Sequence, residues 1–243
     1  MIRFEVEGST AWVTVDRPQA RNAMTFEMYA ELVDCFERVD ADDQILTLVI
    51  SGAGGKAFIA GTDINEFTRF VSPEDGVRYE ARVDAVLDRL EAVRKPVVAF
   101  VEGAAMGAGL AIAAACDVRV VTPDARFGIP IARTVGNCLS MANYVRLSQA
   151  LGAARLKDVI FTARHIGAEE ALACGFVSAI VEKHEADDAL ARLCALLGEH
   201  SATTLWVTKE ALRRARFVPE GDDLVRLAYG SDAFRSNVRR FLS

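Results

Sequence analysis

Two segments rich in small residues have the composition and spacing that could do chemistry in this sequence. The first runs from Ala57 to Ile64 (AFIAGTDI), and the second runs from Glu102 to Leu110 (EGAAMGAGL). Each follows an apolar stretch, and their glycines and alanines let the backbone approach a ligand closely. The second segment also opens a helix-like stretch, whose first N–H groups lack partners within the helix and attract negative charge.

The chemistry that this pair of segments favours is stabilisation of a negatively charged oxygen. One backbone N–H from each segment could meet on the same oxygen and form an oxyanion hole. A single donor of this kind typically lowers the barrier to reaction by roughly 3–4 kcal/mol. The competing interpretation, that each segment is only a tight backbone turn, is possible for either segment alone.

Apolar strands that alternate with helical patterns must position the two segments. Apolar residues repeat at helical spacing after Thr25, which is a candidate N-cap, and again from Val83 to Val93 and from Gly107 to Cys116. Strands are expected at 2–7, 10–15, 45–50, 97–101 and 118–121. This alternation predicts an α/β fold with parallel strands covered on both faces. Most of the chain from Cys138 to Leu242 is predicted to be helical, apart from a short strand at 177–181.

Composition and charge exclude several classes of protein. The chain has 243 residues, of which 51% are hydrophobic and 26% are charged, so it is too apolar for intrinsic disorder. Its 28 basic and 34 acidic residues give a net charge of 28 − 34 = −6. This balance disfavours a general nucleic-acid binder, which neutralises phosphates with Lys and Arg.

Metal and membrane sites are not expected either. The five cysteines form no CxxC pair, which fits free thiols, and the three histidines are not at metal-ligand spacing. The most apolar stretch, Val97 to Cys116, is interrupted by Glu102 and by glycines. Because the N-terminal MIRFEVEG also lacks the features of a leader, we expect a soluble, cytoplasmic protein.

Several motifs in chain order resemble the crotonase superfamily, also called the enoyl-CoA hydratase/isomerase family. They are RPQARNAM at 17–24, AFIAGTDI at 57–64, KPVVA at 95–99 leading into the Gly107–Gly109 turn, ACD at 115–117, FGIP at 127–130 and the stretch 161–177. The resemblance covers nearly the whole chain. It implies a crotonase-like fold, in which a stacked spiral of strands and helices at 1–190 carries the site. A helical region at 191–243 would then close the pocket and mediate oligomerisation.

The resemblance also implies the substrate and the partners. An acyl-CoA thioester would bind with its carbonyl oxygen between the N–H groups of Ala60 and Ala108. Coenzyme A, as part of the substrate rather than a permanent cofactor, would contact Ala60, Gly61, Thr62, Asp63, Ile64 and Gly107. Arg21 and Lys56 would meet its phosphates or remain solvated surface cations. A homotrimer or a dimer of trimers would use the apolar residues Leu205, Val207, Leu212, Leu224, Leu227 and Phe241.

Two positions depart from the family pattern. Hydratases of the family carry two catalytic glutamates, and this chain has Ala111 and Ile131 in their places. Since a general acid or base typically contributes about 10²–10⁴-fold, ordinary water addition is disfavoured. Polar groups that could substitute are Asn137, Cys138, Ser140 and Glu66. Alternatively, Asn137 or Ser140 caps a helix, Cys138 is a small buried residue and Glu66 lies in solvent.

Two hypotheses about function follow. The first is an enzyme that stabilises a thioester enolate without a carboxylate base, as in decarboxylation of a malonyl-type CoA. Double-bond isomerisation is weakened by Ile131, because isomerases of the family often keep the second carboxylate. The second is an acyl-CoA-binding protein that has kept its pocket and lost its catalysis.

Overall fold

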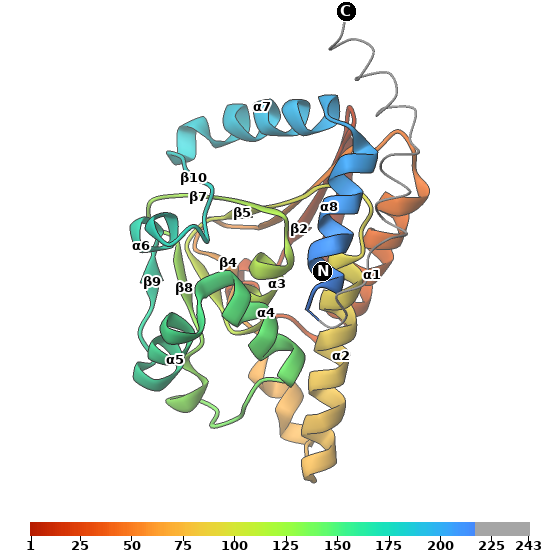
Figure 1. Ribbon diagram of the computed structural model, residues 1–243. Coiled ribbons are helices and arrows are strands. Elements are labelled where there is room, and N and C mark those ends of the chain that lie inside the picture. The colour runs from red at the N-terminus through yellow and green to blue at the C-terminus, as the bar shows by residue number, and fades with distance from the viewer. Residues whose placement is uncertain (217–243) are drawn as a thin grey trace, which may run out of the picture.

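Two β-sheets form the centre of the protein. The computed structural model describes residues 1–216 (Figure 1). The six-stranded sheet has the order β1 (Ile2–Glu7), β2 (Thr10–Val15), β3 (Thr47–Gly52), β5 (Val97–Val101), β7 (Val118–Val121) and β10 (Ala179–Ile180). The four-stranded sheet has the order β4 (Ala57–Ile59), β6 (Ala104–Met106), β8 (Arg126–Gly128) and β9 (Ile166–Gly167). The pairs β1–β2 and β8–β9 are antiparallel, and the other neighbours are parallel.

From β3 to β8, consecutive strands alternate between the two sheets and so wind a spiral. Strands β3, β5 and β7 lie side by side in the larger sheet, and β4, β6 and β8 follow each of them into the smaller sheet. Helix α2 (Pro73–Glu91) connects the first turn of the spiral to the second, and α3 (Ala108–Ala115) connects the second to the third. The predicted α/β class and the expected crotonase-like spiral are therefore confirmed.

Helices cover both faces of the larger sheet, as predicted. Helix α1 (Phe26–Ala41) begins at its expected cap, where the Thr25 hydroxyl accepts a hydrogen bond from the Met28 N–H at 3.3 Å. Its apolar side packs into the main core, which it shares with α2 and α3. Helix α7 (Ala186–Glu199) crosses the opposite face, where Leu190 and Cys194 pack with Val98 of β5 (Figure 1).

Between Cys138 and residue 216, the chain is mainly helical, as expected. It contains α4 (Met141–Leu151), α5 (Ala153–Thr162), α6 (Ala168–Ala173), α7 and α8 (Ala202–Arg214). The expected division between residues 190 and 191 falls inside α7. Leu224, Leu227 and Phe241, which were assigned to oligomer contacts, lie outside the described residues. Within residues 1–216, no helix combines the length and the apolar character needed to cross a membrane.

The smaller sheet was not predicted, and its strands explain why. Those strands are two or three residues long, so they show neither the alternation nor the apolar run by which a strand is recognised. Short 3₁₀ turns complete the described elements, at Pro18–Ala20, Ile64–Arg69, Pro130–Ala132 and Lys183–Glu185.

Candidate functional site

Direct backbone contact holds the two small-residue segments together. A side chain at Gly109 would place its Cβ 2.0 Å from the Ile59 carbonyl oxygen, so only glycine lets the first turn of α3 pack on β4. Gly107, the residue before the helix, has φ +53° and ψ −116°, a conformation that L-residues rarely adopt. The sequence therefore brings the start of α3 against the end of β4 through its glycines.

A cavity of about 470 Å³ opens where the two segments meet. Its volume lies within the range typical of small-molecule sites. The lining includes most of the residues singled out from the sequence, namely Ala60, Gly61, Thr62, Asp63, Ile64, Gly107, Ala108, Ala111, Ile131 and Asn137. The two predicted segments thus form one site.

The hydrogen bonds of the first segment show which of its backbone N–H groups are free. Ala60 was expected from the sequence to be the oxyanion donor, but the Ala60 N–H donates to the Arg21 carbonyl oxygen at 3.1 Å. Two residues further on, the Thr62 N–H makes no hydrogen bond within residues 1–216, and the same is true of the Ala108 N–H. Both residues line the cavity. The free backbone donors of the site are therefore those of Thr62 and Ala108.

A chain of hydroxyl groups holds Thr62 in place. The Thr62 hydroxyl lies 2.7 Å from the Tyr29 hydroxyl of α1 and 2.7 Å from the Tyr79 hydroxyl of α2. Burial raises the pKa of Tyr79 to about 12 and raises the pKa of Tyr29 still further, so both phenols stay protonated near neutral pH. The residue that presents the first N–H is thereby tied to two helices.

The cations near the cavity are not the ones that the sequence favoured. Arg21 and Lys56 are exposed, and neither side chain lines the cavity. Arg17 does line it, and its Nη1 lies 2.6 Å from the Asp63 Oδ2. The hydrogen bonds from the Asn65 N–H and from Arg17 lower the pKa of Asp63, so this carboxylate stays ionised and holds the start of the 3₁₀ turn.

The two positions that depart from the family pattern both face this site. Ala111 on α3 and Ile131 in the 3₁₀ turn after β8 line the same cavity as Thr62 and Ala108. The alanine and isoleucine side chains at these positions offer only hydrocarbon to the cavity.

The four polar residues that could replace the missing glutamates lie in different places. Asn137 lines the cavity, whereas Cys138 is exposed and lines a neighbouring cavity of about 610 Å³, so it is not the buried residue of the alternative interpretation. The Glu66 Oε1 accepts a long hydrogen bond of 3.4 Å from the Phe26 N–H at the start of α1, and Glu66 does not line the cavity. Ser140 caps α4, since its hydroxyl accepts from the Asn143 N–H at 3.0 Å. The capping alternative is therefore confirmed for Ser140.

Removing this cap should cost stability. The Ser140→Ala variant is expected to lower the free energy of unfolding by about 1 kcal/mol, because the Asn143 N–H loses its acceptor. Urea denaturation followed by circular dichroism measures the change. Ser148→Ala in the same helix is the matched control and should lose nothing, because alanine is the better helix former there. Equal losses in the two variants would contradict the capping role.

The sequence interpretation missed one carboxylate of the site, Glu80. This α2 residue lines both the 470 Å³ cavity and the 610 Å³ cavity, and its Oε2 accepts a hydrogen bond from the Ser140 N–H at 2.9 Å. Burial, with a smaller contribution from nearby Asp84, raises the pKa of Glu80 to about 7. Helical spacing could have found it, since it lies three residues before Val83 and seven before Leu87, on the buried face of α2.

The described residues contain no set of side chains suited to bind a metal ion. Within residues 1–216, no three His, Cys, Asp or Glu side chains are gathered so that they could hold a metal ion. The five cysteines are free thiols.

Comparison with known proteins shows the family to which the chain belongs. The sequence model of a family described as enoyl-CoA hydratase/isomerase matches residues 5–222. The chain is 34% identical over 231 residues to a short-chain-enoyl-CoA hydratase of Clostridium acetobutylicum, covering 95% of this chain and 87% of that protein. It is 33% identical over 184 residues to a crotonyl-CoA hydratase of Syntrophomonas wolfei, covering 76% and 70% of the two chains.

Solved structures give the same result. The crystal structure of an enoyl-CoA hydratase/carnithine racemase from Magnetospirillum magneticum superimposes with a TM-score of 0.85 at 28% identity. The alignment covers 100% of this chain and 87% of the other. Fold, cavity and sequence agree, and the chain belongs to the enoyl-CoA hydratase/isomerase family of the crotonase superfamily.

Proposed function

We propose that this protein is an enzyme that binds an acyl-CoA thioester and stabilises the enolate formed from it. The observation that carries the proposal is the pair of free N–H donors, from Thr62 and Ala108, on one cavity. The relatives support the substrate class, because their names describe hydratases of enoyl-CoA and crotonyl-CoA.

The chemistry follows from where charge develops. When the carbon beside the thioester carbonyl loses a proton or a carboxylate group, an electron pair moves onto the carbonyl oxygen. Preformed donors lower the barrier because they need no reorganisation as that charge appears. Ala108 is the first residue of α3, so the positive end of the helix dipole adds to the same effect.

Coenzyme A would enter as part of the substrate along the segment from Ala60 to Ile64. Its thioester would lie at Thr62 and Ala108, and its phosphates would remain outside the cavity, where Arg21 and Lys56 are exposed. A homotrimer or a dimer of trimers is part of this proposal. The apolar side chains of Met141 and Phe161 are 77% and 79% exposed and offer surface for such contacts. Sedimentation of a monomer would contradict the oligomer.

Ordinary hydration is not the reaction that these residues favour. Ala111 and Ile131 place hydrocarbon at the two positions where hydratases of the family carry glutamates, whereas double-bond isomerisation and decarboxylation proceed through an enolate without added water. The same absence favours a second candidate, a protein that binds acyl-CoA esters without turning them over.

A panel of thioesters tests the proposal and separates the candidates. Purified protein is titrated calorimetrically with crotonyl-CoA, 3-hexenoyl-CoA and methylmalonyl-CoA, and product formation is followed by mass spectrometry. We expect binding of the esters and turnover of 3-hexenoyl-CoA or methylmalonyl-CoA in excess of crotonyl-CoA hydration. Binding without turnover would favour the non-catalytic candidate, and absence of binding to all three esters would overturn the proposed function.

A further inference from the structure

We propose that Glu80 of α2 is the acid–base residue of this site. Its carboxylate would remove a proton from the carbon beside the thioester carbonyl and later return it. The inference rests on the proposed function, because it needs an acyl-CoA in the cavity. It places the proton-transfer group on α2, whereas the two substituted positions, Ala111 and Ile131, lie on α3 and after β8.

The position of Glu80 carries the inference. Among the described residues that line the 470 Å³ cavity, Glu80 is the only glutamate. It shares the wall with Thr62, Ala108 and Ala111. It also lines the adjacent 610 Å³ cavity, so Glu80 borders both spaces. A thioester held by the donors of Thr62 and Ala108 would therefore lie in the space that Glu80 faces.

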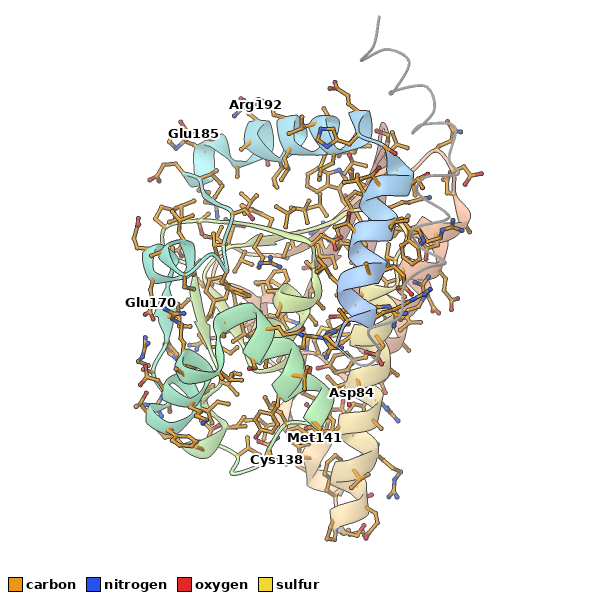
Figure 2. All side chains as sticks on the ribbon, in the orientation of Figure 1. Asp84, Cys138, Met141, Glu170, Glu185 and Arg192 are labelled. Carbon is orange, nitrogen blue, oxygen red and sulfur yellow. The ribbon has the colours of Figure 1, made fainter. Side chains whose placement is uncertain are left out.

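The carboxyl group of Glu80 is held at one oxygen and available at the other. Its Oε2 accepts from the Ser140 N–H at 2.9 Å, and its Oε1 makes no hydrogen bond within residues 1–216. Asp84 lies one helical turn further along α2, and its Oδ1 accepts a hydrogen bond from the Ser140 hydroxyl at 2.7 Å. Figure 2 shows Asp84 beside the start of α4. The contact with Ser140 fixes the direction of Glu80 while one oxygen stays free to accept a proton.

The surroundings of Glu80 suit a group that both takes and gives a proton. Burial raises its pKa to about 7, so both protonation states are populated near neutral pH. The other charged or titratable groups that line the two cavities are Arg17, Asp63, Tyr79, Asp84 and Cys138. Of these, Arg17 is paired with Asp63 at 2.6 Å, and the Tyr79 phenol is protonated near neutral pH.

The step balances without a co-reactant. The Glu80 carboxylate accepts the proton, the carbon–hydrogen electron pair forms a carbon–carbon double bond, and the carbonyl electron pair moves onto the oxygen between the two N–H donors. The reverse step returns the proton from the Glu80 carboxylic acid to the same carbon, or to the γ-carbon when the substrate is a 3-enoyl thioester. The second outcome moves the double bond into conjugation with the carbonyl.

A purely structural role for Glu80 gives different expectations. As an anchor for α4, Glu80 would need only an oxygen that accepts the Ser140 N–H, and the glutamine side chain supplies one. Asp84 offers the matched control, because it lies on the same helix and contacts the same serine. The pair Glu80→Gln and Asp84→Asn therefore separates proton transfer from anchoring.

The test measures exchange of the protons next to the carbonyl of butyryl-CoA in D₂O by mass spectrometry. The wild-type protein should catalyse exchange, and Glu80→Gln should lower the rate by about 10²–10⁴-fold while binding butyryl-CoA with unchanged affinity. Asp84→Asn should retain the rate within a few-fold.

The pH dependence gives a readout that anchoring would not change. The wild-type exchange rate per unit of bound ester should rise with pH and level off above about 7, because ionised Glu80 is the active form. Asp84→Asn should move this midpoint to lower pH, since the neighbouring negative charge is gone, and Glu80→Asp should keep a midpoint at a reduced rate. The residual rate of Glu80→Gln should not show this midpoint.

Three results would overturn the inference. The first is a Glu80→Gln variant that exchanges protons at the wild-type rate. The second is an equal loss of exchange rate in Glu80→Gln and Asp84→Asn with the pH midpoint unchanged. The third is a wild-type protein that binds butyryl-CoA and catalyses no exchange. The last result would leave acyl-CoA binding intact. If no acyl-CoA ester binds, the proposed function and this inference both fail.

Discussion

Replacing Ala108 by proline is expected to lower the turnover of acyl-CoA thioesters by about 10²–10³-fold, because the variant loses one oxyanion donor. Ala108 is the first residue of α3 and its N–H has no partner within residues 1–216, so proline removes no hydrogen bond of the fold. Proline is also well tolerated at the first position of a helix. The loss should appear in kcat, measured with whichever ester of the panel is turned over.

The control keeps the N–H at the same position. Ala108→Gly changes the side chain and retains the donor, so its kcat should remain within a few-fold of the wild-type value. Circular dichroism and thermal denaturation of the proline variant check that the protein is folded. A folded Ala108→Pro variant with wild-type kcat would show that this N–H does not stabilise the reacting oxygen.

Replacing Arg146 by alanine is expected to lower the free energy of unfolding by about 3–5 kcal/mol, because the buried Glu91 carboxylate then keeps only Arg216 of its two arginine partners. The Arg146 side chain is 2% exposed, and its Nε lies 2.9 Å from the Glu91 Oε1. It also contacts Asp88 at 2.9 Å and the Asn143 amide oxygen at 2.7 Å, and thus joins α2 to α4. Equilibrium denaturation in urea measures the loss.

A surface ion pair provides the comparison for Arg146. Arg155 is 34% exposed and lies 3.3 Å from the Glu170 carboxylate, so Arg155→Ala should cost at most about 1 kcal/mol. Burial opposes the ionised form of Glu91, but its hydrogen bonds to Arg146 and Arg216 outweigh this and lower its pKa. The stabilisation is therefore present above the ordinary pKa of a glutamate and is lost as the pH falls through the lowered value. Similar losses in the two variants would contradict the buried network.

The larger sheet and its helices were predictable because their signals lie within single segments. The apolar run near Ile50 and the helical spacing after Thr25 each identify an element without knowledge of its neighbours. The smaller sheet has no such local signal, because its strands are stabilised by pairing between turns of the spiral. That pairing is a property of the assembled fold.

The site was predictable at the level of segments and not at the level of individual groups. The glycines and alanines correctly indicated close backbone approach, but a sequence does not show which N–H is already used. The Ala60 N–H was expected to be free, but it donates to the Arg21 carbonyl oxygen, and the Thr62 N–H is free instead. Glu80 was not predicted because its place on the cavity wall depends on how α2 packs against the site, which the sequence does not show.

The contact between Gly109 and the Ile59 carbonyl oxygen has a consequence for how this fold can change its reaction. The start of α3, which carries the free Ala108 N–H, packs on β4 main chain to main chain, so its position does not depend on the side chains of Ala111 and Ile131. Substitutions at such positions can therefore change the groups that handle protons while this backbone donor stays in place. This modularity lets one scaffold acquire a new reaction through a few changes of side chain, with no need to rebuild its most demanding geometry.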